Sequence, residues 1–205
     1  MTIITKDLSI MQYKIVMDKM INFNTKRQID SNDEIWFLEH PAVYTLGQAT
    51  DKKNIPVNND NIPIIQSNRG GQITYHNIGQ LIIYPLLQLK RYNLGIKSLV
   101  FLLEQVIIDL LATKNIIGHR REAMPGVYVN NKKIAALGLR VSKGCTYHGL
   151  SLNIAMDLKP YDNINPCGYN NLIITQTSDL NPDISMLYCK SYLKKNLISA
   201  ITTFV

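Results

Sequence analysis

The stretch GVYVNNKKIAALGLRVSKGCTYHGLSLNIAMD, residues 126–157, constrains the fold more than any other part of the chain. Its apolar and polar residues alternate, which is typical of β-strands that bury one face. Asn130-Asn131 and Lys143-Gly144 stand where the hairpin turns between such strands are needed. The sequence therefore predicts a β-meander over these residues.

Shorter strands and three helices are predicted around this meander. Strands are expected within 33–48, with a break at His40-Pro41, and over 63–68, 71–76 and 80–87, with a turn-rich loop at 51–61. Helical spacing of apolar residues predicts helices over 8–24 and 96–113 and an amphipathic helix within 183–204. No repeat or linker divides the 205 residues. We therefore predict one α+β domain over 1–205, a mostly antiparallel or mixed sheet with helices packed on it.

The composition places the chain among globular proteins, with 46% hydrophobic and 18% charged residues. The start, MTIITKDLSIM, lacks the basic-then-apolar order of a signal peptide. The most apolar long stretch, residues 99–112, is interrupted by Glu104 and Asp109, which favours a core helix over a membrane span. Three widely spaced cysteines do not suggest a disulfide framework. We therefore predict a cytoplasmic protein with reduced thiols and no membrane insertion.

The net charge of +7, with a pI of about 9.3, favours an acidic partner. Nucleic acid is one candidate. The lysines and arginines are scattered, however, with no basic run longer than KRY or LKK and no RNA-stacking motif. An acidic protein partner, attracted by a long-range field, fits equally well.

The octapeptide INPCGYNN places Cys167 between Pro166 and Gly168. Because proline fixes its own φ and glycine tolerates unusual backbone geometry, this turn can hold a thiol in one position. A free cysteine is otherwise a small buried hydrophobe, and the turn alone favours that interpretation. Cys145 and His148 form a C-x-x-H, but no second ligand pair at zinc spacing accompanies it, so no metal site is predicted.

The most unusual string is RGGQITYH, residues 69–76. Two adjacent glycines cost backbone entropy, so a fold keeps them where the chain turns tightly or approaches something closely. A strand after them directs Thr74 and His76 to one face and Ile73 and Tyr75 to the other. The alternatives are a glycine hairpin with His76 in the core, or a phosphate cradle. The cradle is less favoured because no G-x-x-x-x-G-K follows.

A second unusual string is KKIAALGLRVSKGCTYHGLSLN, residues 132–153. Lys133 precedes the run Ile134–Leu137, whose small residues leave room beside the sheet. A lysine at such an edge is more often a solvated side chain than a catalytic one. Gly138 and Gly149 are expected where a ligand approaches the backbone closely.

Taken together, these motifs closely resemble those of the lipoyl(octanoyl) transferases, within the biotin/lipoate protein ligase superfamily. The motifs, in order, are EHPAVYTLGQ, RGGQITYH, KIAALG, HGLSLN and NPCG. The resemblance runs from about Trp36 to Cys167 and on through GYNN. It implies the ligase-like fold and transfer of octanoate, without a cofactor, from a thioester on acyl carrier protein. The acceptors it implies are lysines of lipoyl domains in 2-oxoacid dehydrogenases and of the glycine cleavage H protein.

The resemblance also implies the roles of individual residues. Cys167 becomes the nucleophile that carries the acyl group, and Lys133 becomes its catalytic partner. The acyl pocket carried over position by position comprises Arg69, Gly70, Gly71, Gln72, Ile73, Thr74, Tyr75, His76, Ala136, Leu137, Gly138, Gly149, Leu150 and Ser151. For His40, His76 and His148, a supporting role at the thioester and a place in the core are equal alternatives.

One motif departs from the family. The usual Tyr-His-Gly-Pro-Gly-Gln is here YHNIGQ, with Asn77 and Ile78 in place of glycine and proline. We therefore expect a different loop after His76, with an effect on the edge of the pocket. Three rival functions stay open: an ATP-dependent lipoate or biotin ligase, which needs no nucleophilic cysteine, a non-catalytic acyl-binding module, and, with the least support, nucleic-acid binding.

Overall fold

A computed structural model describes residues 2–56, 61–165 and 172–204 of the chain, so Cys167 lies outside the described residues. Six strands form the main sheet, in the order β1 (Ile3–Ile10), β2 (Asp33–Glu39), β6 (Gln80–Leu86), β9 (Cys145–Asn153), β8 (Lys132–Ser142) and β7 (Gly126–Val129). A smaller sheet has the order β4 (Ile64–Gln66), β3 (Val43–Leu46) and β5 (Thr74–His76). The helices are α1 (Tyr13–Lys26), α2 (Ile96–Ala112) and α3 (Met186–Thr202).

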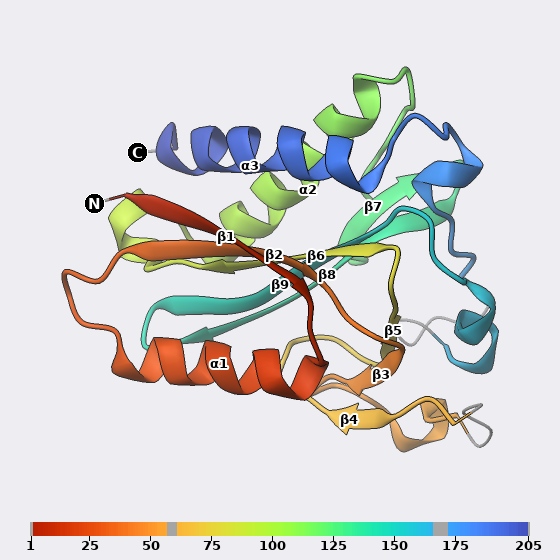
Figure 1. The fold of residues 1–205 in the computed structure, drawn as a ribbon, viewed down its shortest axis with the longest axis horizontal. Coiled ribbons are helices and arrows are strands. Elements are labelled where there is room, and N and C mark those ends of the chain that lie inside the picture. Colours follow the sequence, from red (N-terminus) through yellow and green to blue (C-terminus); the bar gives the residue numbers. More distant parts are fainter. Residues whose placement is uncertain (1, 57–60, 166–171, 205) are drawn as a thin grey trace.

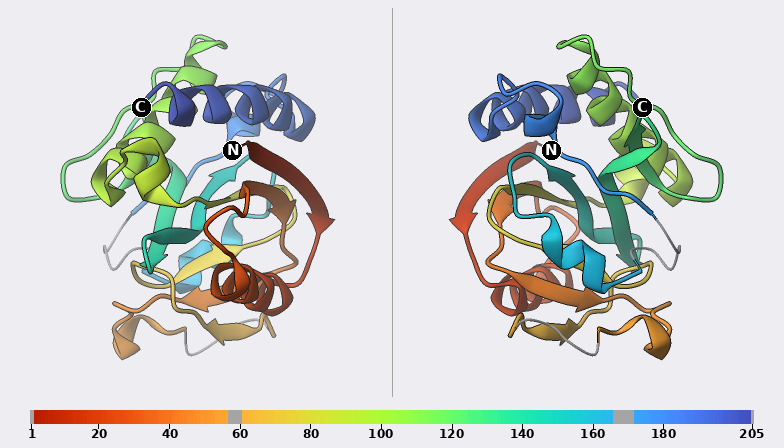
Figure 2. Two further views of the ribbon diagram at one scale, coloured as in Figure 1. Left: turned by 90° about the vertical axis from the view of Figure 1, so that its left-hand side faces the viewer. Right: turned by 90° about the vertical axis from the view of Figure 1, so that its right-hand side faces the viewer.

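These elements confirm the predicted α+β class with a mixed sheet. β1 pairs with β2 in parallel, and β3 pairs with β4 in parallel, whereas the other strand pairs within the two sheets are antiparallel. Helices α2 and α3 cover one face of the main sheet, and α1 and the smaller sheet lie on the other (Figure 1, Figure 2). Among the described residues, no helix is both long and apolar enough to span a bilayer.

The predicted meander is present as β7, β8 and β9, and its turns have the expected backbone. Asn130 and Asn131 have φ values of 47° and 66°, and Lys143 and Gly144 have φ values of 51° and 76°. Two consecutive residues with positive φ are the mark of a type I′ hairpin turn, whose twist matches that of the flanking strands.

The prediction of a helix over 8–24 is wrong at its start. The chain is a strand up to Ile10, and the helix begins only at Tyr13. Within β1 only Ile3 is buried, so the strand forms through backbone pairing with β2 rather than through a hydrophobic pattern. The predicted strand over 71–76 is likewise shorter, because Gly71 has a φ of +79° and regular pairing begins at Thr74.

The two faces of the main sheet are buried differently. On the face covered by α2 and α3, here called the apolar face, Leu103 and Ile107 of α2 and Leu193 of α3 pack on Leu81 and Ile83 of β6, all fully buried. Burying a side chain of this size contributes about 1.5–3 kcal/mol. Cys189 also lies in this core, where burial raises the pKa of its thiol to about 12.

On the opposite face, here called the pocket face, Tyr13, Val16 and Met20 of α1 pack on Ile82 and Tyr84 of β6. Residues 82 and 84 therefore face one way and residues 81 and 83 the other, as strand alternation requires. Tyrosines and histidines, rather than aliphatic side chains, dominate the end of this face near the start of α1.

Candidate active site

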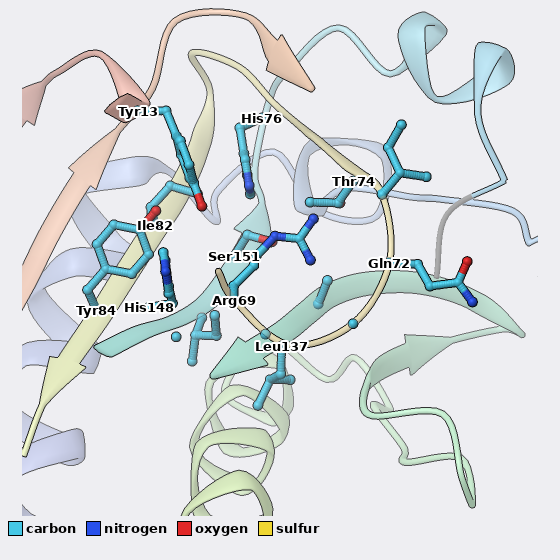
Figure 3. Close-up of a pocket in the computed structure, with 16 residues that line it drawn as sticks. Tyr13, Arg69, Gln72, Thr74, His76, Ile82, Tyr84, Leu137, His148 and Ser151 are labelled. Carbon is cyan, nitrogen blue, oxygen red and sulfur yellow. The ribbon is translucent and has the colours of Figure 1, made fainter. Parts of the chain in front are cut away.

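A pocket opens on the pocket face between the glycine segment (residues 69–76) and strands β8 and β9 (Figure 3). The space within it is about 490 Å³ when the open solvent at its mouth is included. Its lining is Tyr13, Arg69, Gly71, Gln72, Ile73, Thr74, His76, Ile82, Tyr84, Ala136, Leu137, Gly138, His148, Gly149, Leu150 and Ser151. The structure thus brings together most of the residues that the sequence assigned to an acyl pocket. Gly70, Tyr75, His40 and Lys133 do not line it.

The floor of the pocket is formed where small residues of β8 and β9 face each other. Ala136 pairs with Ser151, and Gly138 pairs with Gly149, so each pair shares one face of the sheet. A Cβ atom on Gly149 would lie 2.1 Å from the backbone oxygen of Ile83. Gly149 is therefore needed for close packing of β9 on β6, in addition to its place in the pocket lining.

The glycine segment is held over this floor by hydrogen bonds. The Gly70 N–H donates to the backbone oxygen of Leu139 at 3.2 Å. The guanidinium of Arg69 is buried and donates from Nη2 to the backbone oxygen of Thr45 at 2.6 Å and from Nε to the Thr45 hydroxyl at 3.1 Å. Gly70 and Arg69 therefore fix the segment between β3 of the smaller sheet and β8.

Tyr75 leaves the pocket in the direction that strand alternation predicts. Thr74 and His76 face the pocket, while Tyr75 is buried in the core of the smaller sheet against Tyr44 and Tyr161. The Tyr161 hydroxyl donates to the Tyr75 backbone oxygen at 2.9 Å. Tyr75 thus supports the strand that carries His76, and does not contact the cavity.

Three histidines cluster at one end of the pocket face. His40 is fully buried, with Nδ1 2.6 Å from the Met11 backbone oxygen and Nε2 2.9 Å from the Tyr84 hydroxyl. His76 is also buried, with Nδ1 2.7 Å from Oε1 of Gln80. These contacts fit the core interpretation of His40, whereas His76 both belongs to the core and lines the pocket.

His148 differs from the other two histidines in its backbone and its partners. It lies in β9 with a φ of +55°, a conformation that non-glycine residues adopt only when the surroundings enforce it. Its Nε2 is 2.7 Å from Oδ1 of Asn68, and its buried Nδ1 has no hydrogen-bond partner among the described residues. The Tyr13 ring stacks on both His76 and His148, with centroids 5.8 Å and 6.3 Å away.

Burial makes all three imidazoles neutral at physiological pH. Desolvation lowers the pKa of His40 to about 4 and, with help from neighbouring positive charge, lowers the pKa values of His76 and His148 to about 3. A neutral imidazole both donates and accepts hydrogen bonds. Figure 3 shows His148 beside Tyr13 and Tyr84 at this end of the pocket. The histidines there provide polar groups but carry no charge.

Lys133 is buried, with a side chain enclosed by the loop before β7. The residue is only 3% exposed, so the interpretation as a solvated edge lysine is wrong. Its Nζ donates to the Pro125 backbone oxygen at 3.1 Å and lies 5.3 Å from the centre of the Tyr128 ring. Its backbone bonds to the chain that follows Cys167: the Lys133 N–H donates to the Ile173 oxygen at 2.9 Å.

The other sequence features near the site have structural roles. Cys145 is buried, and its thiol donates to Oε1 of Gln88 at 3.5 Å. Within the described ranges, no group of three or more His, Cys, Asp or Glu side chains is arranged to hold a metal ion.

The turn after His76 is shaped by backbone contacts. Gly79 has a φ of +90°, and a Cβ there would lie 2.1 Å from the Ala155 backbone oxygen. The Ala155 N–H donates to the Gly79 oxygen at 2.9 Å, and the Ile78 N–H donates to Oδ1 of Asn77 at 2.8 Å. Ile78 is 49% exposed and does not line the pocket. Neither of the two residues that depart from the family motif, Asn77 and Ile78, lines the described pocket.

Sequence reasoning missed three pocket residues. Tyr13, Ile82 and Tyr84 line the cavity, although each lies in a segment read only as a helix or a strand. Tyr13 opens α1, and its hydroxyl lies 2.6 Å from that of Ser67, next to the glycine segment. For Tyr13 and Tyr84 the only available signal was a tyrosine within an apolar stretch, which does not by itself separate a pocket residue from a core residue. Ile82 gave no signal beyond that of a strand residue.

Known proteins resemble this chain in sequence and in fold. The family model of the lipoyl protein ligase A/B catalytic domain matches residues 12–198. An octanoyltransferase of Xanthomonas campestris pv. campestris (strain B100) is 46% identical over 94% of this chain and 82% of its own length. An octanoyltransferase of Klebsiella pneumoniae (strain 342) is 45% identical over 97% of this chain and 92% of its own.

Solved structures with the same fold are more distant in sequence. Lipoate-protein ligase A bound with ATP superposes with a TM-score of 0.80 at 14% identity, covering 98% of this chain and 86% of the ligase. The biotin protein ligase of Aquifex aeolicus in complex with biotin and ATP superposes with a TM-score of 0.58 at 12% identity, covering 99% and 69%. These two show the fold alone. The family match and the close relatives together establish that the chain belongs to the lipoyl protein ligase A/B catalytic domain family, alongside its octanoyltransferases.

Proposed function

We propose that this chain transfers an octanoyl group from a thioester on acyl carrier protein to a lysine of a lipoyl domain, through an acyl-thioester on Cys167. Octanoyl transfer is the activity named for the close relatives above. The observation that carries the proposal is the buried Lys133, on a strand that lines the pocket, with its backbone bonded to Ile173, six residues after Cys167 in the sequence.

In the first step the Cys167 thiolate attacks the carbonyl carbon of the carrier thioester. A new carbon–sulfur bond forms, the old one breaks, and the carrier thiolate leaves and takes up a proton. One thioester replaces another, so the step is nearly balanced in free energy. A cysteine has a pKa of about 8.5, and a nearby ammonium such as that of Lys133 increases its thiolate fraction.

In the second step the amine of the acceptor lysine attacks the acyl-thioester. An amide bond forms, the carbon–sulfur bond to Cys167 breaks, and the thiolate is regenerated. The acceptor amine is protonated at neutral pH, since lysine has a pKa of about 10.4. Lys133, once deprotonated, accepts the proton as general base. Both steps proceed without a cofactor, because the donor thioester supplies the activated acyl group.

The pocket suits an eight-carbon chain. Burying about six or seven methylene and methyl groups at about 0.8 kcal/mol each contributes about 5 kcal/mol to binding. In the β8–β9 register, Lys133 precedes Ala136 and Gly138, and His148 lies opposite Leu139 at the far end. The tail thus extends from the reacting carbonyl along the paired small residues toward the histidines. This path places His148 near the end of the tail rather than at the thioester.

The partners are proposed from charge and from the family. Lipoyl domains are the general acceptor class, and the family resemblance points to those of 2-oxoacid dehydrogenases and to the glycine cleavage H protein. The net charge of +7 complements acidic carrier proteins and acidic lipoyl domains, and opposite charge chiefly raises the association rate. The same charge does not require nucleic acid as a partner, and we propose none.

Intact-mass analysis after mixing with octanoyl-carrier protein, with no nucleotide present, tests the proposal. We expect a hydroxylamine-labile octanoyl adduct that maps to Cys167. It is lost in Cys167→Ala and kept in Cys189→Ala, whose thiol is buried in the apolar core. Transfer that persists in Cys167→Ala, or that requires ATP, would contradict the proposal and favour a ligase or a non-catalytic module.

Lys133→Ala supplies the second test. Removing the ammonium and the base slows both steps, and general acid–base catalysis alone is worth about 100- to 10,000-fold. Single-turnover rates for acylation and for transfer to a lipoyl domain should both fall. Unchanged rates of acylation and transfer in Lys133→Ala would show that Lys133 is not a catalytic residue.

A further inference from the structure

The peptide unit between Pro125 and Gly126 is hydrogen bonded at both of its polar ends. Its carbonyl oxygen, on Pro125, accepts from Nζ of Lys133 at 3.1 Å. Its N–H, on Gly126, donates to Oε1 of Glu104 at 2.8 Å. One peptide group therefore joins the buried carboxylate to the buried ammonium, and each charge polarises the peptide in the sense that strengthens the other bond.

Glu104 is itself held in place. It is 5% exposed on α2, and its second oxygen, Oε2, accepts from Nε of Arg120 at 3.0 Å. Arg120 in turn donates from Nη2 to the Phe101 backbone oxygen and to Oε1 of Gln105, both at 2.9 Å, and lies over the Phe101 ring. A buried carboxylate with both oxygens engaged has a fixed orientation, and it transmits that orientation to the peptide.

Gly126 completes the arrangement because a side chain there would displace the lysine. Its φ is +144°, and a Cβ would lie 3.0 Å from Cε and 3.3 Å from Nζ of Lys133. The same Cβ would lie 2.7 Å from the Ala135 backbone oxygen. The Lys133 side chain thus packs against the bare backbone of the peptide that its Nζ contacts.

We propose that Glu104 is a positioning residue for Lys133, acting through the Pro125–Gly126 peptide. The Glu104 carboxylate fixes the Pro125–Gly126 peptide at the start of β7, and the carbonyl oxygen of this peptide holds the Lys133 ammonium in one position. The negative charge behind the peptide also favours the protonated form of the lysine. This inference rests on the proposed role of Lys133 for its catalytic meaning, but the coupling between the two side chains is measurable without catalysis.

The experiment compares Glu104→Gln with Asp33→Asn in the full chain. Glutamine keeps an acceptor for the Gly126 N–H and removes the charge. Asp33 is an equally buried carboxylate, bonded to Tyr92 and to arginines, on β2, which β6 and β9 separate from β8. The measurement is NMR titration of the Lys133 side chain in protein labelled on lysine, assigned by its loss in Lys133→Arg.

In Glu104→Gln we expect the titration midpoint of Lys133 to fall by about half a pH unit. The kcat of octanoyl transfer should fall by about tenfold, with the KM for octanoyl-carrier protein unchanged. In Asp33→Asn the midpoint and the kcat per folded molecule should stay at their original values. A Lys133 titration equal in both variants and the parent chain would overturn the inference.

Glu104→Asp keeps the inference testable if the glutamine variant does not fold. Aspartate retains the charge and lacks the reach to Gly126, so the midpoint of Lys133 should fall measurably, but by less than half of the shift expected for Glu104→Gln. No movement would count against the coupling. A parent chain without octanoyl transfer but with coupled titration would refute the proposed function alone. Transfer with uncoupled titration would refute the inference alone.

Discussion

The two faces of the main sheet bury different kinds of side chain. The apolar face buries aliphatic side chains such as Leu103, Ile107 and Leu193 against one another. The pocket face buries tyrosines, neutral histidines and the guanidinium of Arg69 in a hydrogen-bonded cluster that lines a cavity. A buried polar group needs a partner, so Arg69, His40 and His76 are each hydrogen bonded to particular neighbours.

This difference separates stability from function. Aliphatic packing is tolerant in its details and supplies most of the folding free energy. A polar cluster is costly to build and supplies a cavity with defined hydrogen-bonding groups. Mutations of aliphatic residues on the apolar face should therefore change stability alone, and mutations on the pocket face should also change acid sensitivity or substrate choice.

The largest expected effect comes from the apolar face. Leu103→Ala removes a fully buried side chain from α2 and should lower the free energy of unfolding by about 2–5 kcal/mol. The rate of octanoyl transfer per folded molecule should not change. Denaturant unfolding and the specific activity check both parts. Leu187→Ala, at a position 76% exposed on α3, is the matched control and should cost less than about 0.5 kcal/mol. A change in the rate of octanoyl transfer per folded molecule in Leu103→Ala would contradict the separation of stability from function between the two faces.

The next effect tests the histidine cluster through pH. In the unfolded chain the imidazoles of His40, His76 and His148 take up protons below about pH 6.5. In the folded chain their pKa values are lowered to about 4, 3 and 3. The unfolded state thus binds more protons between about pH 6.5 and 4, and the free energy of unfolding falls as the pH falls through that window.

Each such histidine contributes a slope of up to about 1.4 kcal/mol per pH unit. His40→Gln should reduce the pH dependence of the unfolding free energy by up to that amount. His119→Gln is the control, because His119 lies outside the cluster and is partly exposed. Equal slopes in the parent chain and in His40→Gln would show that the cluster is not buried in neutral form.

The smallest expected effect compares two adjacent residues of β6. Ile82 lines the pocket and Ile83 belongs to the apolar face. Both Ile→Val changes should cost about 0.5–1.5 kcal/mol of stability. Only Ile82→Val adds space for the acyl tail. It should raise the decanoyl-to-octanoyl preference by about fourfold, from about 0.8 kcal/mol per methylene. Competition between the two acyl-carrier substrates measures this ratio, and an equal change in Ile83→Val would contradict the assignment of faces.

Local patterns predicted much of the fold. The turns at Asn130-Asn131 and Lys143-Gly144 follow from residue types that tolerate positive φ, and α2 follows from apolar residues at helical spacing. Strand β1 was not predictable in this way. It buries one residue and pairs in parallel with a strand more than twenty residues away, so its own sequence carries almost no pattern.

The candidate site was predicted by carrying over the family motifs, and glycines and small residues such as Gly71, Ala136 and Gly138 alone indicated only close packing. It was missed where the signal depends on tertiary structure. Tyr84 reads as a core residue from its neighbours, and only the fold shows it beside the pocket. Glu104 reads as an interruption of an apolar helix, and only the fold brings it to the peptide that Lys133 contacts.

The turn at Asn77–Gly79 has a consequence for how this enzyme can be altered. Its shape depends on Gly79 and on backbone bonds to Ala155, while Ile78 points outward. Substitution of this exposed residue should therefore leave the pocket lining in place. A spectroscopic reporter attached at Ile78 should therefore leave the rate of octanoyl transfer unchanged.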